Sequence, residues 1–154
     1  MAEVRFYHLT AQPLERALPV MLERSLERGW RALVRGTDAA GLEVLDRHLW
    51  TYRDESFLPH GLVRDGAGPA QPVLLSDRHG NPNSAAALFL IDRAEATPDE
   101  MREFEITAVL FDGNDEDALD HARGQWAGVA EAGLMAVYWA QNDDGSWVKK
   151  TESA

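Results

Sequence analysis

Two short segments carry residue types that often serve in ligand binding, and the first lies where a phosphate-binding loop would be. Residues 36–41 read Gly-Thr-Asp-Ala-Ala-Gly, follow an expected strand and open an expected helix. A phosphate-binding loop needs Lys and then Ser or Thr directly after the second glycine, to contact phosphate and magnesium. Leu42 and Glu43 stand at those positions, and a glutamate repels phosphate. We therefore predict a glycine turn at a helix N-terminus and no nucleotide site.

The second segment begins like a calcium-binding loop. The spacing of Asp112, Asn114 and Glu116 fits the first ligand positions of such a loop. Such a loop also needs Gly at its sixth position and Glu at its twelfth, where this chain has Asp117 and Arg123. The acidic residues instead suit the first turn of a helix, where carboxylates interact favourably with the helix dipole. Because no two of the five histidines are spaced i,i+3 or i,i+4, the sequence predicts neither a metal ion nor a cofactor.

Residues 46–62 lie at the end of an expected helix and in the loop that follows, and they place several apolar side chains in that loop. Leu49 is expected to face the core, whereas the neighbouring Trp50 points elsewhere. Phe57 then precedes Pro59, which fixes its own φ angle and biases the residue before it toward an extended conformation. Apolar loop side chains either plug the core of their own chain or form a docking patch for another protein. The local sequence leaves both alternatives open.

The composition is typical of one soluble domain. With 154 residues and 45% hydrophobic residues, the chain can bury a sizeable core. We place a single α/β domain at residues 1–150 and expect residues 151–154 to be a disordered tail. There is no cysteine, no apolar run of 18 residues and no signal segment at the N-terminus. These features predict a cytoplasmic protein that does not contact a membrane.

The charge argues against direct binding to nucleic acid. The net charge is −11, with 15 basic against 26 acidic residues. Phosphate contacts require clustered Lys and Arg, but the chain has only two lysines, Lys149 and Lys150. We therefore expect no strong direct nucleic-acid binding.

Hydrophobic patterning predicts strands that alternate with helices. Thr10 is expected to cap the first helix, Thr37 or Asp38 the second, and Asn114 or Asp115 the last. The alternation indicates a three-layer α/β sandwich with a mostly parallel central sheet. We expect a nucleotide-fold-like (Rossmann-like) architecture without a phosphate-binding loop. The expected strands cover residues 3–9, 30–35, 73–75, 87–91, 106–111 and 134–140, and the expected helices end near residues 28, 52 and 132.

Several motifs occur together in a familiar order. Residues 49–60 fit the pattern L-W-x5-S-F-x-P-H, and Ala122-Arg123-x-x-Trp126 and Tyr138-Trp139 follow later. With these motifs, the sequence resembles the chi subunit of the bacterial DNA polymerase III holoenzyme over about residues 3 to 150. The other segments that agree are Val4 to Leu9, Pro72 to Leu75, Asn81 to Asn83 and Phe111 to Asp115.

The resemblance implies a non-catalytic accessory subunit that is associated with the clamp loader in DNA replication and repair. It implies that the psi subunit, or a helicase that competes for the same patch, binds at Trp50, Phe57, Pro59 and His60. Through the replisome the chain would be associated with the nucleoid. Two alternatives stay open: a small-ligand-binding or enzymatic α/β domain, which a deep pocket with several titratable groups would favour, and a free-standing interaction module.

The resemblance also implies a site for the acidic C-terminal tail of single-stranded-DNA-binding protein. Arg123 and Trp126 match the family pattern on the last helix. Two alanines, Ala127 and Ala130, stand where we expect Lys or Arg. Lys149 and Lys150 would partly replace these cations if the C-terminal segment folded back beside the helix. We expect weak, salt-dependent tail binding at these residues.

Overall fold

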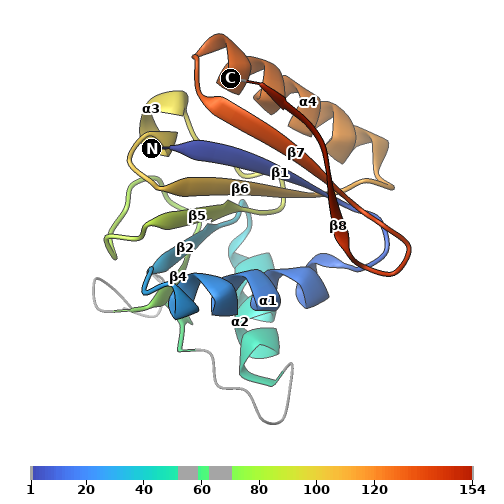
Figure 1. Cartoon of the computed structure of the whole chain (residues 1–154). Helices are drawn as coiled ribbons and strands as arrows, with labels where there is room; N and C mark the ends of the chain where they lie inside the picture. Colours follow the sequence, from blue (N-terminus) through green and yellow to red (C-terminus); the bar gives the residue numbers. More distant parts are fainter. Residues whose placement is uncertain (1, 52–58, 63–70, 154) are drawn as a thin grey trace.

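The computed structural model describes residues 2–51, 59–62 and 71–153 of the chain (Figure 1). Its described residues form one eight-stranded sheet with the order β3-β4-β2-β5-β6-β1-β7-β8. All neighbouring strands are parallel except β7 and β8. The strands are β1 (Glu3–Leu9), β2 (Ala32–Arg35), β3 (Gly61–Leu62), β4 (Val73–Ser76), β5 (Ala87–Leu90), β6 (Ile106–Asp112), β7 (Met135–Gln141) and β8 (Trp147–Ser153).

Four helices among the described residues cover the two faces of this sheet. Figure 1 shows α1 and α2 on one side and α3 and α4 on the other. The buried side chains accordingly divide into two clusters, one under each helical layer. The prediction of a three-layer α/β sandwich with a mostly parallel sheet is confirmed. The helices are α1 (Leu14–Glu27), α2 (Ala39–Thr51), α3 (Pro98–Met101) and α4 (Glu116–Glu131).

The central strands show why the sheet needs helices on both faces. In β1, Val4 and Phe6 enter the core under α4, whereas Leu9 enters the core under α1 and α2. In β6 every residue from Ile106 to Phe111 is buried. A strand that is apolar on both faces is stable only between two covering layers, so this sequence requires the sandwich.

The start of α1 differs from the sequence-based expectation. Pro13, and not Thr10, is the residue before the helix, and no side chain caps it. The Thr10 hydroxyl donates instead to the backbone carbonyl of Gln141, at 2.9 Å. The Gln141 side-chain oxygen also accepts the backbone N–H groups of Thr10, Ala11 and Gln12 at 3.0–3.3 Å. Thr10 therefore ties the loop after β1 to the end of β7 and does not begin a helix.

The end of the chain also differs. We expected a tail after Lys150, but Thr151, Glu152 and Ser153 belong to β8 and pair with β7. The antiparallel partner gives their backbone groups hydrogen bonds that a free tail would lack. The expected strand boundaries otherwise agree to within two residues, and Asp115 caps α4 as one of the two expected residues.

Candidate functional site

The Trp50 position, which the resemblance assigns to partner binding, lies at the C-terminus of α2. Leu42, Leu45 and Leu49 are buried against the sheet. Trp50 follows Leu49 and is turned outward, with 48% of its surface exposed. The helix periodicity therefore separates two adjacent apolar residues, as the sequence predicted.

His60 supports Trp50 from the protein side. The two ring centroids lie 4.3 Å apart. His60 is 5% exposed, and its Nε2 lies 3.1 Å from both the carboxylate Oδ1 and the backbone oxygen of Asp46. Because both neighbours are acceptors, this nitrogen carries the proton and donates. Pro59 is half-buried beside His60, and Phe57 lies outside the described residues.

Arg123 and Trp126 lie on α4 but have different surroundings. The Arg123 guanidinium is exposed, 3.5 Å from the Asp120 carboxylate. Trp126 is half-buried, with its ring centroid 5.3 Å from that of Phe6 and 6.0 Å from that of Tyr138. Trp126 is therefore both a packing residue and an aromatic wall that faces the surface beside Arg123.

His8 extends this aromatic wall, a feature that the sequence analysis missed. Its Nδ1 lies 2.5 Å from the Tyr138 hydroxyl, and its ring packs against Phe111. Burial lowers the pKa of His8 from 6.5, with a hydrogen bond to the Gly113 backbone and the nearby Asp112 acting in the opposite direction. Burial raises the pKa of Tyr138. A neutral imidazole next to a neutral phenol gives this wall a weakly polar end. Strand alternation, which puts His8 on the face of Val4 and Phe6, was the available signal.

The two lysines do not join this group as expected. Lys149 is paired with Trp139, and Thr151 is paired with Tyr138, with a register shift between them. Directly paired residues project from the same face of a sheet, so Lys149 lies on the face opposite to Tyr138 and α4. Its Nζ contacts the Glu152 carboxylate at 2.8 Å. Lys150 falls at the register shift and is exposed. The C-terminal segment does fold back beside β7, but it turns Lys149 away from Trp126.

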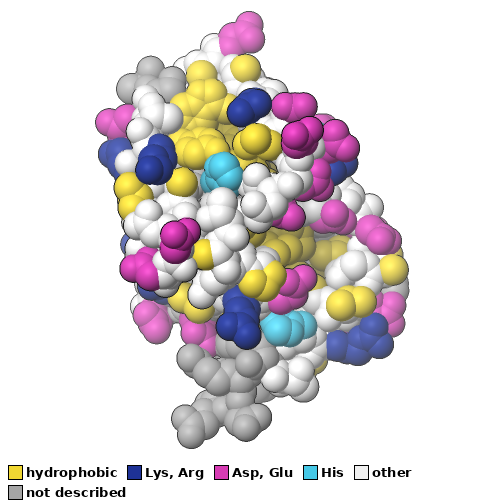
Figure 2. All heavy atoms as spheres, turned by 90° about the vertical axis from the view of Figure 1, so that its right-hand side faces the viewer, with side chains coloured by type: hydrophobic (Ala, Val, Ile, Leu, Met, Phe, Trp, Pro, Cys, Tyr) yellow, Lys and Arg dark blue, Asp and Glu magenta, His cyan; other side chains and the backbone are white. Residues whose placement is uncertain are grey.

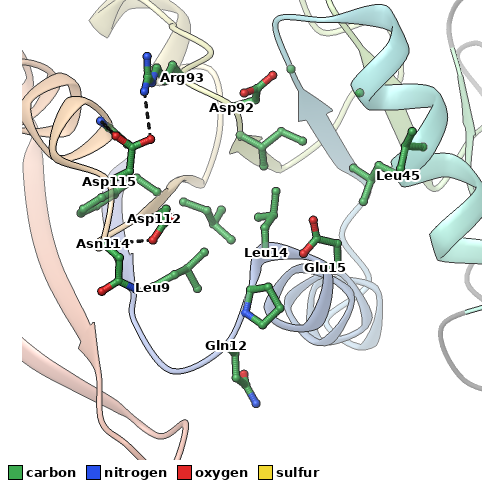
Figure 3. A pocket seen from close by; sticks show the side chains of 18 of the residues that line it. Leu9, Gln12, Leu14, Glu15, Leu45, Asp92, Arg93, Asp112, Asn114 and Asp115 are labelled. Atoms are coloured by element: carbon green, nitrogen blue, oxygen red, sulfur yellow. Dashed lines mark hydrogen bonds and ion pairs between the residues drawn. The ribbon is translucent and has the colours of Figure 1, made fainter.

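A cavity of about 870 Å³ lies at the carboxyl ends of β1, β2, β5 and β6, between the first turns of α1, α2 and α4. Figure 2 looks onto this edge and shows hydrophobic side chains at the base of a hollow, with acidic side chains around it. In Figure 3, Leu9, Leu14 and Leu45 surround the hollow, with Asp92, Asp112 and Asp115 along it. This is the edge at which open α/β sheets bind ligands.

The glycine turn predicted at residues 36–41 lies at this cavity and is used for packing. A Cβ on Gly36 would lie 2.9 Å from Leu42 Cδ2, so the glycine lets α2 approach the end of β2 closely. Asp38 accepts a hydrogen bond from the Ala40 backbone N–H, at 3.0 Å. Of the two expected caps, Asp38 therefore serves α2, whereas the Thr37 hydroxyl donates to Asp92.

The acidic segment after β6 is the N-terminus of α4. Asp115 Oδ1 accepts the backbone N–H groups of Asp117 and Ala118, at 3.0 and 3.3 Å. The Ala118 amide, followed by the Asp117 amide and Arg93, lowers the pKa of Asp115. This carboxylate thus stays ionised as a helix cap. Within the part of the chain that the structure describes, no three His, Asp or Glu side chains lie close enough together to hold a metal ion. None of the helices described there has the length and apolar character needed to cross a membrane.

These features define an α/β protein in which the glycine turn at the sheet edge is used for packing and α2 carries an exposed tryptophan, Trp50. Comparison with known proteins agrees with this class. Residues 1–136 match the family model described as DNA polymerase III chi subunit, HolC. The chain belongs to this family of DNA polymerase III chi subunits.

Two curated relatives carry the same family name. The chain is 30% identical over 91 residues to the probable DNA polymerase III subunit chi of Rickettsia prowazekii, which covers 59% of this chain. It is 29% identical over 84 residues to DNA polymerase III subunit chi of Pseudomonas aeruginosa, which covers 53% of this chain. The matches span 55% and 59% of these relatives, so the chain spans little more than half of their length.

Proposed function

We propose that the chain is a non-catalytic accessory subunit of the replicative DNA polymerase III holoenzyme, associated with the clamp loader. The observation that carries this proposal is the exposed Trp50, held against His60, in a chain of the chi family. A half-exposed tryptophan on a rigid support loses little conformational freedom on binding, and such residues often dominate protein interfaces. The partner at Trp50, Phe57 and Pro59, with the buried His60 as the support of Trp50, is the psi subunit or a helicase that competes for the same patch.

A second contact, to the C-terminal tail of single-stranded-DNA-binding protein, is proposed at α4. A tail that ends in an apolar side chain and a free carboxylate needs an apolar wall next to a cation. Trp126 supplies such a wall, and Arg123 supplies a cation on the next turn of the same helix. Ala127 and Ala130 supply none, so this contact is weak and depends on salt. In this arrangement the chain links single-stranded-DNA-binding protein to the polymerase during replication and repair.

The absence of catalysis by the chain itself is part of the proposal. The sheet edge holds a cavity with several titratable groups, the feature that would favour an enzyme or a small-ligand binder. Its carboxylates, however, make structural hydrogen bonds: Asp115 caps α4, Asp38 caps α2, and Asp112 accepts the backbone N–H of Asn114. The pKa of Asp115 is lowered by its capping bonds, and a carboxyl group with a lowered pKa is poorly suited to transfer protons at neutral pH.

Affinity purification from the source bacterium tests this function. A tagged full-length chain, expressed at its normal level, should retain clamp-loader subunits together with psi or a helicase, as quantified by mass spectrometry. The purified chain alone should hydrolyse no nucleotide. Retention of none of these proteins would contradict the proposal, as would nucleotide turnover that a single substitution in this chain abolishes.

A further inference from the structure

The cavity at the carboxyl edge of the sheet combines an apolar base with an acidic rim. Leu42, Leu45, Ile91 and Leu110 form much of its base and are nearly buried. The charged side chains that line it come from α1, from α2 and the residue before it, from the loop after β5, from the end of β6 and from the residue that caps α4. They are Glu15, Asp38, Asp92, Asp112 and Asp115, with Arg93 and, when protonated, His48 as the basic groups.

The rim keeps an excess of negative charge after its internal contacts are counted. Arg93 pairs with Asp115 at 3.2 Å, as Figure 3 shows. Five carboxylates and one guanidinium leave four uncompensated negative charges with His48 neutral. His48 Nε2 lies 2.7 Å from the backbone oxygen of Glu15 and donates there, which joins α1 to α2 at the cavity.

The rim carboxylates have capacity left for a ligand. Asp92 accepts a side-chain hydrogen bond from the Thr37 hydroxyl, and Asp112 accepts one from the Asn114 backbone N–H. An ionised carboxylate offers about four lone-pair sites. A cation that enters above the apolar base therefore meets acceptors without breaking the bonds that cap the helices.

The same arrangement excludes anions. Helix N-termini bind phosphate through free backbone N–H groups. At α4 and α2, however, some of these N–H groups already donate hydrogen bonds to the side chains of Asp115 and Asp38. An incoming phosphate or carboxylate would also face four excess negative charges. The ligand must therefore combine an apolar body with a positive charge.

We propose that this cavity receives a short apolar segment of a partner protein that carries an Arg or Lys side chain. Two observations favour a protein segment over a free amine. The cavity is large, near the upper end of the range for small-molecule sites. Its apolar lining also continues outward to Val44, which is 58% exposed on α2 and which a small amine in the cavity would leave uncovered. None of the two proposed partner sites' described residues, Trp50, Pro59, His60, Arg123 and Trp126, lines this cavity.

Matched peptides provide the test. Two six-residue peptides with blocked ends, one alternating leucine and arginine and the other leucine and glutamate, are titrated into the ¹⁵N-labelled full-length chain at low salt. The arginine peptide should shift the amide resonances of Leu14, Leu45, Asp92 and Asn114, and bind about tenfold or more tightly than the glutamate peptide. Hexylammonium serves as the free-amine probe and should bind more weakly than the arginine peptide.

Charge and surface variants assign the contact. Glu15→Gln with Asp92→Asn removes two negative charges from the cavity and should weaken binding of the arginine peptide severalfold. The fold should be retained, because asparagine keeps an acceptor for Thr37 and tolerates the positive φ of 51° at position 92. Glu103→Gln with Glu131→Gln removes the same charge from exposed positions that do not line the cavity, and should leave binding unchanged.

Three outcomes would overturn the proposal. The first is equal or tighter binding of the glutamate peptide. The second is hexylammonium binding as tight as that of the arginine peptide, which would make the cavity a small-amine site. The third is a set of shifted resonances that lies away from the cavity, or the absence of any shift at millimolar peptide. Each of them leaves the proposed polymerase subunit function untouched, because that function rests on Trp50.

Discussion

The indole ring of Trp50 lies against the imidazole ring of His60 at 4.3 Å, and the carboxylate of Asp46 fixes that imidazole from behind at 3.1 Å. The three side chains form a support that begins on α2 and ends in the segment before β3. An exposed tryptophan on such a support is already ordered for binding, which lowers the entropic cost of contact. This relationship is the basis of the first prediction.

Trp50→Ala should mainly weaken partner binding, whereas Leu49→Ala should mainly lower the stability of the fold. Removing Trp50 should weaken partner binding by about 2–4 kcal/mol and lower the free energy of unfolding by about 1 kcal/mol or less. Leu49 is 1% exposed, and its loss should destabilise the fold by about 2–5 kcal/mol through the cavity it leaves. Urea unfolding and titration with the purified partner measure both quantities. A large loss of stability in Trp50→Ala with unchanged binding would make Trp50 a core residue.

Arg123 and Lys149 should contribute unequally to tail binding. Arg123 shares α4 with Trp126, whereas Lys149 projects from the opposite face of the sheet and contacts Glu152. A labelled peptide of the tail of single-stranded-DNA-binding protein should bind weakly at low salt, and more weakly still at moderate salt. Arg123→Ala should reduce this binding and Lys149→Ala should not. A loss of binding in Lys149→Ala but not in Arg123→Ala would place the site on the β8 face. Tight binding that does not depend on salt would also contradict the assignment to Arg123.

Two glycines should respond differently to alanine. A Cβ on Gly113 would lie 1.7 Å from His8 Nε2, so Gly113→Ala must displace the imidazole and should cost about 1–3 kcal/mol of stability. Gly124 lies inside α4, where an added Cβ would meet no heavy atom from outside its own helical turn within 4 Å. There alanine should stabilise by about 0.5–1 kcal/mol, because it restricts the unfolded chain. Thermal melting of both variants checks the prediction, and a stabilised Gly113→Ala would show that His8 moves freely.

The environment of His8 makes a specific prediction about pH. Because the folded-state pKa of His8 is lowered from 6.5, the unfolded chain binds more protons in the window between the folded-state pKa and 6.5. The contribution of neutral His8 to the free energy of unfolding is therefore fully present above pH 6.5 and is lost as the pH falls through this window. Urea unfolding from about pH 8 to about pH 5 should show this loss, and His8→Gln should flatten the profile. An equally steep profile in His8→Gln would assign the titration to other groups.

The layers of the fold were predictable because they depend on local patterns. The mostly apolar run in β6, buried from Ile106 to Phe111, and the alternation in β1 determine the two-sided core. The split between Leu49 and Trp50 followed from helical spacing alone. The sequence analysis missed the seven-residue β8 and two short elements, β3 and α3, whose signals are weak. α3 has only four residues, although Thr97 and Glu100 form a capping box before it.

The candidate sites depended on contacts between distant parts of the chain, which a local pattern does not contain. Thr10 was a reasonable helix cap, but Gln141 lies 131 residues later and binds it. The Tyr138 hydroxyl reaches His8 across 130 residues of sequence. Lys149 lies in the C-terminal segment that was expected to fold back beside the last helix, but a register shift in β8 decides which face of the sheet it occupies. The pairing of β1, β7 and β8 therefore decides which partners Thr10 and His8 have and which face of the sheet Lys149 occupies.

Site-specific photo-crosslinking in living cells tests the central claim most directly. A photoreactive amino acid is placed at the exposed position 51, next to an intact Trp50, in one strain and, as a control, at the exposed Val20 position of α1 in another. We expect position 51 to crosslink to psi or to a helicase that associates with polymerase III, and position 20 not to do so. Crosslinks to these proteins from position 20 alone, with none from position 51, would contradict the assignment of Trp50 as the docking residue.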